Sequence, residues 1–298
     1  MGIKRITFGF ATGTLLAVLA FVGGCARFGG ATEKGEELPP ISVQPTGERH
    51  EGKMVWHDLL TSDPATAKTF YGKLFGWSFV QREPRYTEIL FDGKKIGGIL
   101  RIDPDVDRQA AAQWLCFMSV PNVAQAARKV EKSGGVVVNG PKGFGKRGRG
   151  VLVADAQNAQ LFLLDSASGD PIDEEPRVGT WLWNEVWTLD LERELNFYKP
   201  LGNYAKAESN GEYAVLLGEG QWRMGVRKIK QKEFAGRWLP VVRVEDPAAL
   251  LGKVEALGGR VWTYPESGQN TALISDGDGA FLILQQWSFP EGETEVQP

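Results

Sequence analysis

Apolar positions near residue 54 follow the pattern of a strand, and further along they recur at helical spacing. Residues 54–61 therefore predict a strand and residues 66–75 a helix. Ser62 or Asp63 is the expected N-cap, Pro64 is typical of the first helical position, and Gly76 is typical of the residue that ends a helix. The folded part of the chain thus begins with a strand and a helix.

The two periods continue to alternate beyond this helix. Asp92-Gly93 is a hairpin signal, and a second helix is predicted at residues 123–132. The other predicted strands cover residues 87–91, 96–102, 114–120, 135–138 and 150–164. Several strands with a few interspersed helices predict the α+β class.

The same sequence motifs and the same order of predicted elements occur twice in the chain. Trp56-His57-Asp58-Leu59 corresponds to Trp183-Asn184-Glu185-Val186, and Gln113-Trp114-Leu115 corresponds to Arg237-Trp238-Leu239. Internal duplication explains both matches. We therefore expect a first module over residues 54–170, a linker over 171–176 and a second module over 177–290, with a disordered tail at 291–298.

Residues 1–24 have the layout of a secretory signal, with Lys4 and Arg5 before an apolar run. The sequence that ends in Cys25 resembles a bacterial lipobox, which implies a lipid on this cysteine. The alternative is an uncleaved membrane-spanning anchor. Either interpretation predicts a protein of the cell envelope outside the cytoplasm, on the periplasmic side of the inner or outer membrane if the cell is Gram-negative.

Residues 25–53 are rich in Gly, Pro, Glu and Thr without an apolar period, which predicts a flexible tether. With Cys25 acylated, Cys116 is the one remaining thiol, so no intrachain disulfide is expected. The net charge of -3 provides no basic field for nucleic acid, which is excluded as a partner.

Phe70-Tyr71 and Phe197-Tyr198 in the helices, with turns that begin at Asp155 and Asp276, resemble the vicinal-oxygen-chelate superfamily of glyoxalases, bleomycin-resistance proteins and extradiol dioxygenases. The turns stand where that family has Asp-Pro-Asp-Gly. The resemblance covers residues 54–288. It implies two tandem βαβββ modules, paired about a pseudo-twofold axis into one unit that encloses a cup.

Family enzymes hold a divalent metal in the cup. The positions that the resemblance assigns to the metal ligands are occupied by Trp56 and Trp183 on the first strands and by Phe162 and Ile283 on the last strands. Indole and hydrocarbon groups cannot ligate a metal. We therefore expect no metal or other cofactor, and neither a metal-dependent lyase nor a metal-dependent dioxygenase.

Strand alternation places Asp58 beside Trp56, and Glu185 beside Trp183, with His57 on the opposite face, toward the helix. The two carboxylates could meet in a shared space and act as an acid–base pair. The favoured alternative is that each carboxylate pairs with an arginine or caps a loop at the rim of the sheet.

The segment Gly143-Phe144-Gly145-Lys146-Arg147-Gly148 fits a dinucleotide pattern, but it lies between two predicted strands and lacks the helix that such a site needs. Its basic residues, with Lys142 and Arg149, could form a basic lip. A plain solvated hairpin is the favoured interpretation.

Three functions fit this sequence. In the first, Trp56, Phe162, Trp183 and Ile283 line a cup that binds a small apolar or aromatic molecule, with Asp58 and Glu185 as its polar groups. The second is a metal-free enzyme that uses the two carboxylates. The third is an envelope structural or interaction protein with a filled cup. The sequence favours the first.

Overall fold

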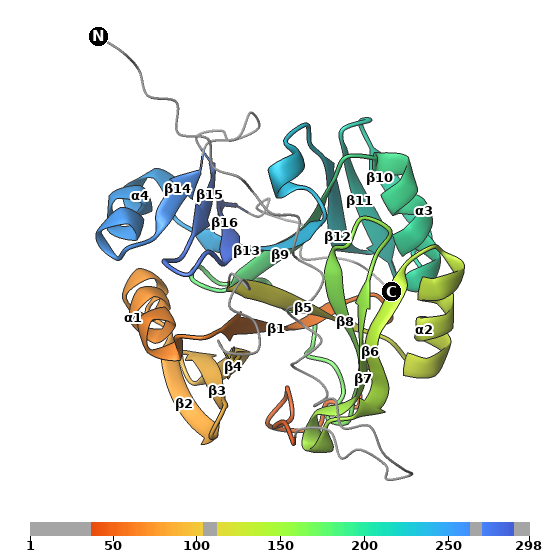
Figure 1. Ribbon diagram of the computed structural model, residues 1–298, viewed down its shortest axis with the longest axis horizontal. Helices are drawn as coiled ribbons and strands as arrows, with labels where there is room; N and C mark the ends of the chain where they lie inside the picture. The colour runs from red at the N-terminus through yellow and green to blue at the C-terminus, as the bar shows by residue number, and fades with distance from the viewer. Residues whose placement is uncertain (1–36, 104–111, 263–269, 289–298) are drawn as a thin grey trace.

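The computed structural model describes residues 37–103, 112–262 and 270–288 (Figure 1). The predicted signal segment and Cys25 lie outside the described residues, as do residues 25–36 of the tether and the tail at 291–298. Among the helices of the described ranges, none is long and apolar enough to cross a membrane.

The first module contains eight strands and two helices. In chain order they are β1 (Met54–Thr61), α1 (Pro64–Phe75), β2 (Ser78–Glu83), β3 (Tyr86–Phe91), β4 (Lys94–Arg101), β5 (Gln113–Ser119), α2 (Val123–Lys132), β6 (Val136–Gly143), β7 (Gly148–Ala154) and β8 (Gln160–Ser166). A short 3-10 turn, Gly145–Arg147, joins β6 to β7.

The second module repeats this order. Its elements are β9 (Trp181–Thr188), α3 (Leu191–Leu201), β10 (Lys206–Ser209), β11 (Tyr213–Gly218), β12 (Gln221–Lys228), β13 (Arg237–Val244), α4 (Pro247–Ala256), β14 (Arg260–Trp262), β15 (Thr271–Ser275) and β16 (Phe281–Gln286). A 3-10 turn, Lys232–Phe234, precedes β13.

Local sequence explains where the helices begin. The carboxylate of Asp63 accepts hydrogen bonds from the backbone amides of Ala65 and Thr66, as predicted for a helix N-cap. Asp190 and Asp246 cap α3 and α4 in the same way. Strand β2 was not predicted, because it is a largely exposed edge strand without alternating apolar positions.

Each module forms one mixed, eight-stranded sheet. The first has the strand order β2-β3-β4-β1-β5-β8-β7-β6, and the second repeats it as β10-β11-β12-β9-β13-β16-β15-β14. The central pair β1 and β5 is antiparallel, whereas β4 lies parallel to β1 and β8 parallel to β5. Two βαβββ units therefore meet at the centre of each sheet.

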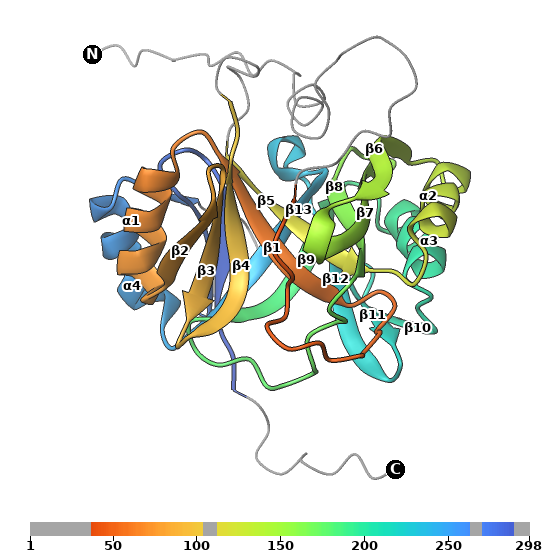
Figure 2. The same cartoon turned by 90° about the horizontal axis from the view of Figure 1, so that it is seen from below.

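This topology confirms the α+β class and the two-module organisation. It differs from the prediction in the content of each module, because one module already contains two βαβββ units and closes its own curved sheet. The chain thus has four units and two cups, rather than two units that share one cup. Each helix packs beside a helix of the other module, α1 with α4 and α2 with α3 (Figures 1 and 2).

Crossed hydrogen bonds join the two modules. The hydroxyl of Tyr71, on α1, donates to Asp276 Oδ2 in the turn between β15 and β16, at 2.9 Å, and accepts from Trp114 Nε1 at 3.1 Å. The second module repeats the arrangement in the opposite direction. Tyr198, on α3, donates to Asp155 Oδ2 at 2.7 Å and accepts from Trp238 Nε1 at 3.1 Å.

The apolar core follows the same crossing. One buried cluster combines side chains of α2, β5 and β8 with side chains of α3 and β12, and a second combines α1 and β1 with β13, β15 and β16. Trp114 and Trp238, which occupy equivalent positions of the repeat, belong to these clusters. Because the two modules share these cores, neither module buries its helix-bearing face alone.

Residues 37–53 differ from the prediction. They form no helix or strand, but they lie against the folded modules, and Leu38 and Ile41 are buried. The prediction of a flexible tether is therefore wrong for this segment, which we call the strap. Two apolar residues, spaced three apart, give too weak a periodic signal to distinguish a packed strap from a linker.

A second buried carboxyl group, that of Glu194 on α3, lies beside the turn at Asp155. Gln157, in this turn, donates a hydrogen bond to Glu194 Oε1 of α3 at 2.6 Å, and Glu194 Oε2 is buried without a partner among the described residues. Burial, followed by the nearby Asp155 carboxylate, raises the pKa of Glu194 to about 9. Burial likewise raises the pKa of Asp155. Glu194 is therefore protonated at neutral pH.

Replacing Tyr198 with phenylalanine should reduce the free energy of unfolding by about 1–3 kcal/mol, because the buried Asp155 carboxylate loses a donor. Tyr71→Phe should have a similar effect through Asp276. Chemical denaturation measures both changes. Lys199→Ala, at an exposed position beside Tyr198, is the control. An unfolding free energy equal to that of wild type would show that the crossed bonds do not stabilise the module interface.

A second prediction concerns pH. Since the folded-state pKa of Glu194 lies above its ordinary value of 4.5, the stabilisation from its protonated form is complete below pH 4.5 and is lost as pH rises toward 9. Across this window wild type should lose up to about 1.4 kcal/mol per pH unit relative to Glu194→Gln, which stays neutral. Denaturation curves of both proteins at several pH values measure the difference. Parallel pH profiles would contradict the assignment.

Candidate binding sites in the two cups

The four positions that the resemblance assigns to a metal do not lie together. Trp56 and Phe162 belong to the apolar cluster on the concave face of the first sheet, which we call the first cup. Trp183 and Ile283 belong to the corresponding cluster of the second sheet, the second cup. The sequence placed all four in one cup because it did not show that each module closes its own sheet.

The residues in these positions do not fit a divalent metal. Their side chains present indole and hydrocarbon, which donate no electron pair to a metal. Across the described ranges, no group of three or more His, Cys, Asp or Glu side chains is placed to hold an ion. The chemistry of each cup must therefore be sought in its carboxylate and its aromatic groups.

In the first cup, Asp58 is buried in a closed set of polar contacts. Its Oδ1 accepts hydrogen bonds from Trp56 Nε1 at 2.8 Å and from the Tyr86 hydroxyl at 2.7 Å. Its Oδ2 lies 3.4 Å from Arg147 Nη1, and Arg147 Nη2 donates to the Tyr86 hydroxyl at 2.7 Å. Burial raises the pKa of Tyr86, so this side chain is a neutral phenol.

Arg147 comes from the hairpin that fits the dinucleotide pattern. The structure places this segment between strands β6 and β7, as predicted, with no helix after it. Lys146 and Arg149 are exposed, but Arg147 is fully buried and its guanidinium lies 5.0 Å from the Trp56 ring. Arg147 therefore belongs neither to a solvated hairpin nor to a basic surface lip, because this residue neutralises Asp58 inside the cup.

In the second cup, Glu185 is neutralised by an arginine that lies on a strand rather than in a hairpin turn. Arg227, on β12, binds it through two nitrogens, with Nε 2.8 Å from Oε2 and Nη2 3.0 Å from Oε1. Trp187 Nε1 also donates to Oε2 at 3.0 Å. The same guanidinium lies 4.5 Å from the Tyr213 ring centre, and Trp183 Nε1 donates to the Tyr213 hydroxyl at 2.8 Å.

Two equivalent glycines make room for these groups. A Cβ at Gly98 would overlap the Tyr86 hydroxyl and the Asp58 carboxylate, and a Cβ at Gly225 would overlap the Tyr213 hydroxyl and the Trp183 indole. Gly98 lies opposite Asp58 in the β1–β4 pair, and Gly225 lies opposite Glu185 in the β9–β12 pair. These repeated glycines were the signal that could have indicated a polar group packed against the backbone.

Asp58 and Glu185 therefore do not form an acid–base pair, and the alternative of separate arginine pairs is correct. The preceding residues in the two strands explain why. His57 Nε2 and Asn184 Oδ1 meet at 2.7 Å across the module interface. Since successive strand residues point to opposite faces, Asp58 and Glu185 turn away from this contact into separate cups.

His57 has a structural role at this interface rather than beneath a helix. Its ring lies 4.3 Å from that of Trp181, and its Nδ1 has no partner in the described part of the chain. Burial lowers its pKa to about 4. The imidazole is therefore neutral at physiological pH.

The first cup is almost completely filled. Leu38 and Ile41 of the strap and Phe144 of the hairpin pack into its apolar cluster, which includes Leu60, Leu115 and Phe162. The remaining cavity has a volume of about 20 Å³ and is lined by Leu38, Asp58, Phe144 and Phe162, among others. This volume is about that of a single water molecule.

The second cup has a more accessible aromatic lining. Trp183 is partly exposed, and its ring lies 6.3 Å from that of Trp222, which is 53% exposed. Farther along the sheet, the rings of Phe234, Trp262 and Phe281 pack against one another.

A further cation lies at this end of the second cup. The Arg237 guanidinium lies 4.8 Å from the Phe281 ring centre. Burial lowers the pKa of Arg237, and its buried Nε has no hydrogen-bond partner among the residues described. The second cup thus combines aromatic surface with an arginine whose Nε–H can still donate a hydrogen bond.

Comparisons with known proteins agree with this architecture. Residues 53–161 match the model of the Glyoxalase/Bleomycin resistance protein/Dioxygenase superfamily. A putative glyoxylase, CFP32, from Mycobacterium tuberculosis is 26% identical over 251 residues, which cover 80% of this chain and 96% of that protein. The anthracycline biosynthesis protein DnrV from Streptomyces peucetius is 24% identical over 259 residues, which cover 78% and 93%.

Two solved structures share the fold. The Mn(II)-bound glyoxalase from Novosphingobium aromaticivorans aligns with a TM-score of 0.53 and 12% identity, over 80% of this chain and 82% of that one. A variant of homoprotocatechuate 2,3-dioxygenase from B. fuscum aligns with a TM-score of 0.56 and 13% identity, over 87% and 77%. These structural matches show that the chain shares the fold of the two enzymes, and the match to the superfamily model covers residues 53–161.

The buried pair in the first cup gives a test of its structural role. Arg147→Met should reduce the free energy of unfolding by about 3–5 kcal/mol, because it leaves the Asp58 carboxylate buried without its cation. Adding Asp58→Asn to this variant should restore part of the loss. Arg149→Met, at an exposed neighbouring position, is the control. Urea denaturation measures wild type, the two single variants Arg147→Met and Asp58→Asn, the double variant and the control, and additive effects of the two substitutions would contradict the pairing.

Proposed function

We propose that this chain is a metal-independent binding protein, held outside the cytoplasm by a lipid on Cys25, and that its second cup binds a flat aromatic or apolar molecule. The observation that carries the proposal is the difference between the cups. The first is filled by the protein's own strap and hairpin, whereas the second keeps Trp183 and Trp222 partly exposed beside Arg227.

The chemistry of the second cup supports a ligand of this class. Indole and phenyl faces bind flat apolar groups through buried area and stacking. Arg237, with its unpartnered Nε, favours a ligand that also carries a carboxylate or another hydrogen-bond acceptor. A relative that is named for anthracycline biosynthesis is consistent with an aromatic ligand.

The two other functions receive different support. A metal-free enzyme with Asp58 or Glu185 as base is less favoured, because each carboxylate is bonded to an arginine and to an indole N–H. An envelope interaction protein with filled cups is favoured by one observation, the nearly complete filling of the first cup. It would make the exposed surface, rather than the second cup, the working part.

A binding experiment separates these functions. Thermal shift and tryptophan fluorescence of the chain from residue 37 onward should reveal stabilisation by members of a panel of aromatic carboxylates, and the stabilisation should persist in the presence of EDTA. Trp183→Ala should weaken this binding about tenfold or more, because a buried tryptophan contact is lost. Trp287→Ala, a partly exposed tryptophan outside both apolar clusters, should leave it unchanged.

Two results would overturn this proposal. Stabilisation that requires an added divalent metal would mean that the metal-ligand positions are not those of Trp56, Phe162, Trp183 and Ile283. Equal affinity in wild type and in Trp183→Ala would place the ligand elsewhere. The lipid anchor is tested separately, by fractionation of lysed cells. If full-length wild type is found in the soluble fraction, as the Cys25→Ser variant should be, the result would argue against the anchor.

A further inference from the structure

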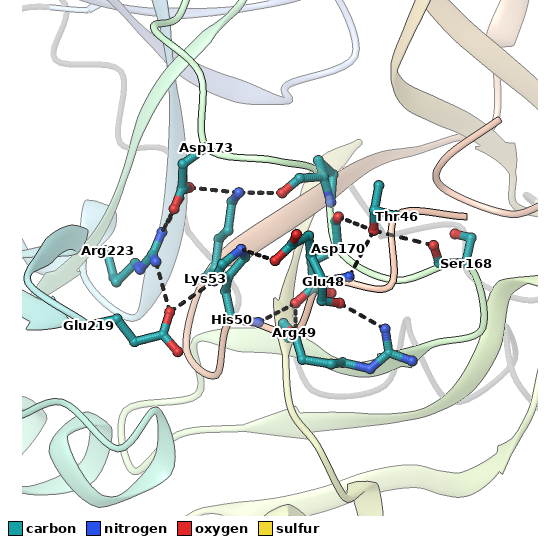
Figure 3. Close-up of polar contacts among 12 residues, drawn as sticks. Thr46, Glu48, Arg49, His50, Lys53, Ser168, Asp170, Asp173, Glu219 and Arg223 are labelled. Atoms are coloured by element: carbon teal, nitrogen blue, oxygen red, sulfur yellow. Dashed lines mark hydrogen bonds and ion pairs between the residues drawn. The ribbon is translucent and has the colours of Figure 1, made fainter. Parts of the chain in front are cut away.

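The strap has two parts that are held in different ways. Residues 46–53 form a polar clamp on the linker between the modules (Figure 3). The Thr46 hydroxyl donates to the Asp170 carbonyl at 2.7 Å, and the His50 amide donates to Asp170 Oδ2, also at 2.7 Å. Asp170 is fully buried and also accepts from the Ser119 hydroxyl at 2.6 Å. This part of the strap is fixed by buried polar groups.

The same clamp reaches the second module. Lys53 Nζ lies 2.7 Å from Asp173 Oδ1, and Arg223 Nη1 lies 2.9 Å from the same oxygen (Figure 3). Arg223 also pairs with Glu219, which accepts from the His50 ring at 2.9 Å. Residues 46–53 are thus held by three segments that are distant in sequence: Ser119, residues 170–173 and Glu219. The position of residues 46–53 does not depend on residues 38–45.

Residues 38–41, by contrast, occupy the first cup mainly through two side chains. Leu38 and Ile41 are buried among the cup's apolar groups. The backbone adds three hydrogen bonds: the Leu38 amide donates to the Phe144 carbonyl at 3.2 Å, Arg147 Nε donates to the Pro39 carbonyl at 2.7 Å, and Lys95 Nζ donates to the Pro40 carbonyl at 3.4 Å. No strand pairing joins residues 38–41 to either sheet.

Between these two parts lies an exposed stretch. Val43 is 68% exposed, and Gln44 and Pro45 are also exposed. The chain can therefore bend here while the clamp stays in place, because few contacts would be lost. We propose that residues 38–41 are a removable plug that occupies a second ligand site in the first cup.

The contacts of the plug define the ligand that would replace it. Removing Leu38 and Ile41 uncovers an apolar surface that includes Leu115, Leu152 and Phe162. It also leaves Arg147 Nε without its acceptor, the Pro39 carbonyl. A flat apolar molecule with one carboxylate, sulfonate or carbonyl group supplies both the apolar surface and the acceptor. The plug is therefore a mimic of that ligand, and plug and ligand exclude each other.

This inference rests on the proposed function only in assuming that an apolar cup of this fold binds small molecules. It concerns the first cup, whereas the proposed function concerns the second.

The test uses 8-anilinonaphthalene-1-sulfonate, a fluorescent aromatic sulfonate, and the chain from residue 37 onward. Leu38→Ser combined with Ile41→Ser weakens the plug but leaves the clamp intact. Val43→Ser, an exposed position of the same strap, is the matched control.

If the plug competes with the ligand, the double variant should bind the probe saturably and about tenfold or more tightly than wild type, because a larger fraction of molecules has an open cup. The gain should persist in a Trp183→Ala background, in which the second cup is impaired. Loss of the gain in that background would place the probe in the second cup and overturn the plug, while leaving the proposed function standing.

A second measurement needs no substitution. In wild type, saturating probe should accelerate hydrogen exchange of the Leu38 amide, which is bonded to Phe144, and leave the His50 amide in the clamp protected. This readout decides the case if the double variant is unstable. Unchanged exchange at Leu38 under saturating probe would overturn the proposal, as would an unchanged probe affinity in a stably folded double variant.

Discussion

The rest of the structure depends on the crossed contacts in which a tyrosine from a helix of one module binds an aspartate in a turn of the other. Tyr71 binds Asp276 and Tyr198 binds Asp155, and a tryptophan from a central strand completes each set. All of these groups are buried, so each hydroxyl and carboxylate needs its partner. Because the contacts run in both directions, they fix the orientation of the two modules and leave one concave face of each sheet free to form a cup.

The four positions that the resemblance assigns to metal ligands present only indole and hydrocarbon, but each concave face contains one buried carboxylate. In both cups that charge is balanced by an arginine and by an indole N–H, yet the arginine comes from a hairpin turn in one module and from a strand in the other. Removing either arginine would leave Asp58 or Glu185 buried without its cation, which is strongly destabilising. The two modules thus balance equivalent carboxylates with arginines from different elements.

The two cups also differ in what covers them. The strap and the Phe144 hairpin close the first cup, whereas partly exposed aromatic groups line the second. The polar clamp at Asp170 explains how the strap is held so close to the first cup (Figure 3). A segment that composition assigns to a linker thereby covers the first cup, whereas aromatic side chains of the second cup remain partly exposed.

The sequence by itself determined the features that depend on local spacing. Asp63 and Pro64 marked the start of α1, the repeated Trp-His/Asn-Asp/Glu motif revealed the duplication, and Trp56, Phe162, Trp183 and Ile283 were correctly expected to line a concave face. These signals are local because helix caps and strand alternation act over a few residues.

Only the tertiary structure decided which residues share a site. It divided the four cup positions between two sheets, buried Arg147 against Asp58, and turned Glu185 toward Arg227. It also packed the strap into the first cup. These outcomes depend on contacts between residues that are far apart in the chain. Burial and charge determine which residues pair once the sheets have formed. A local sequence pattern therefore does not predict them.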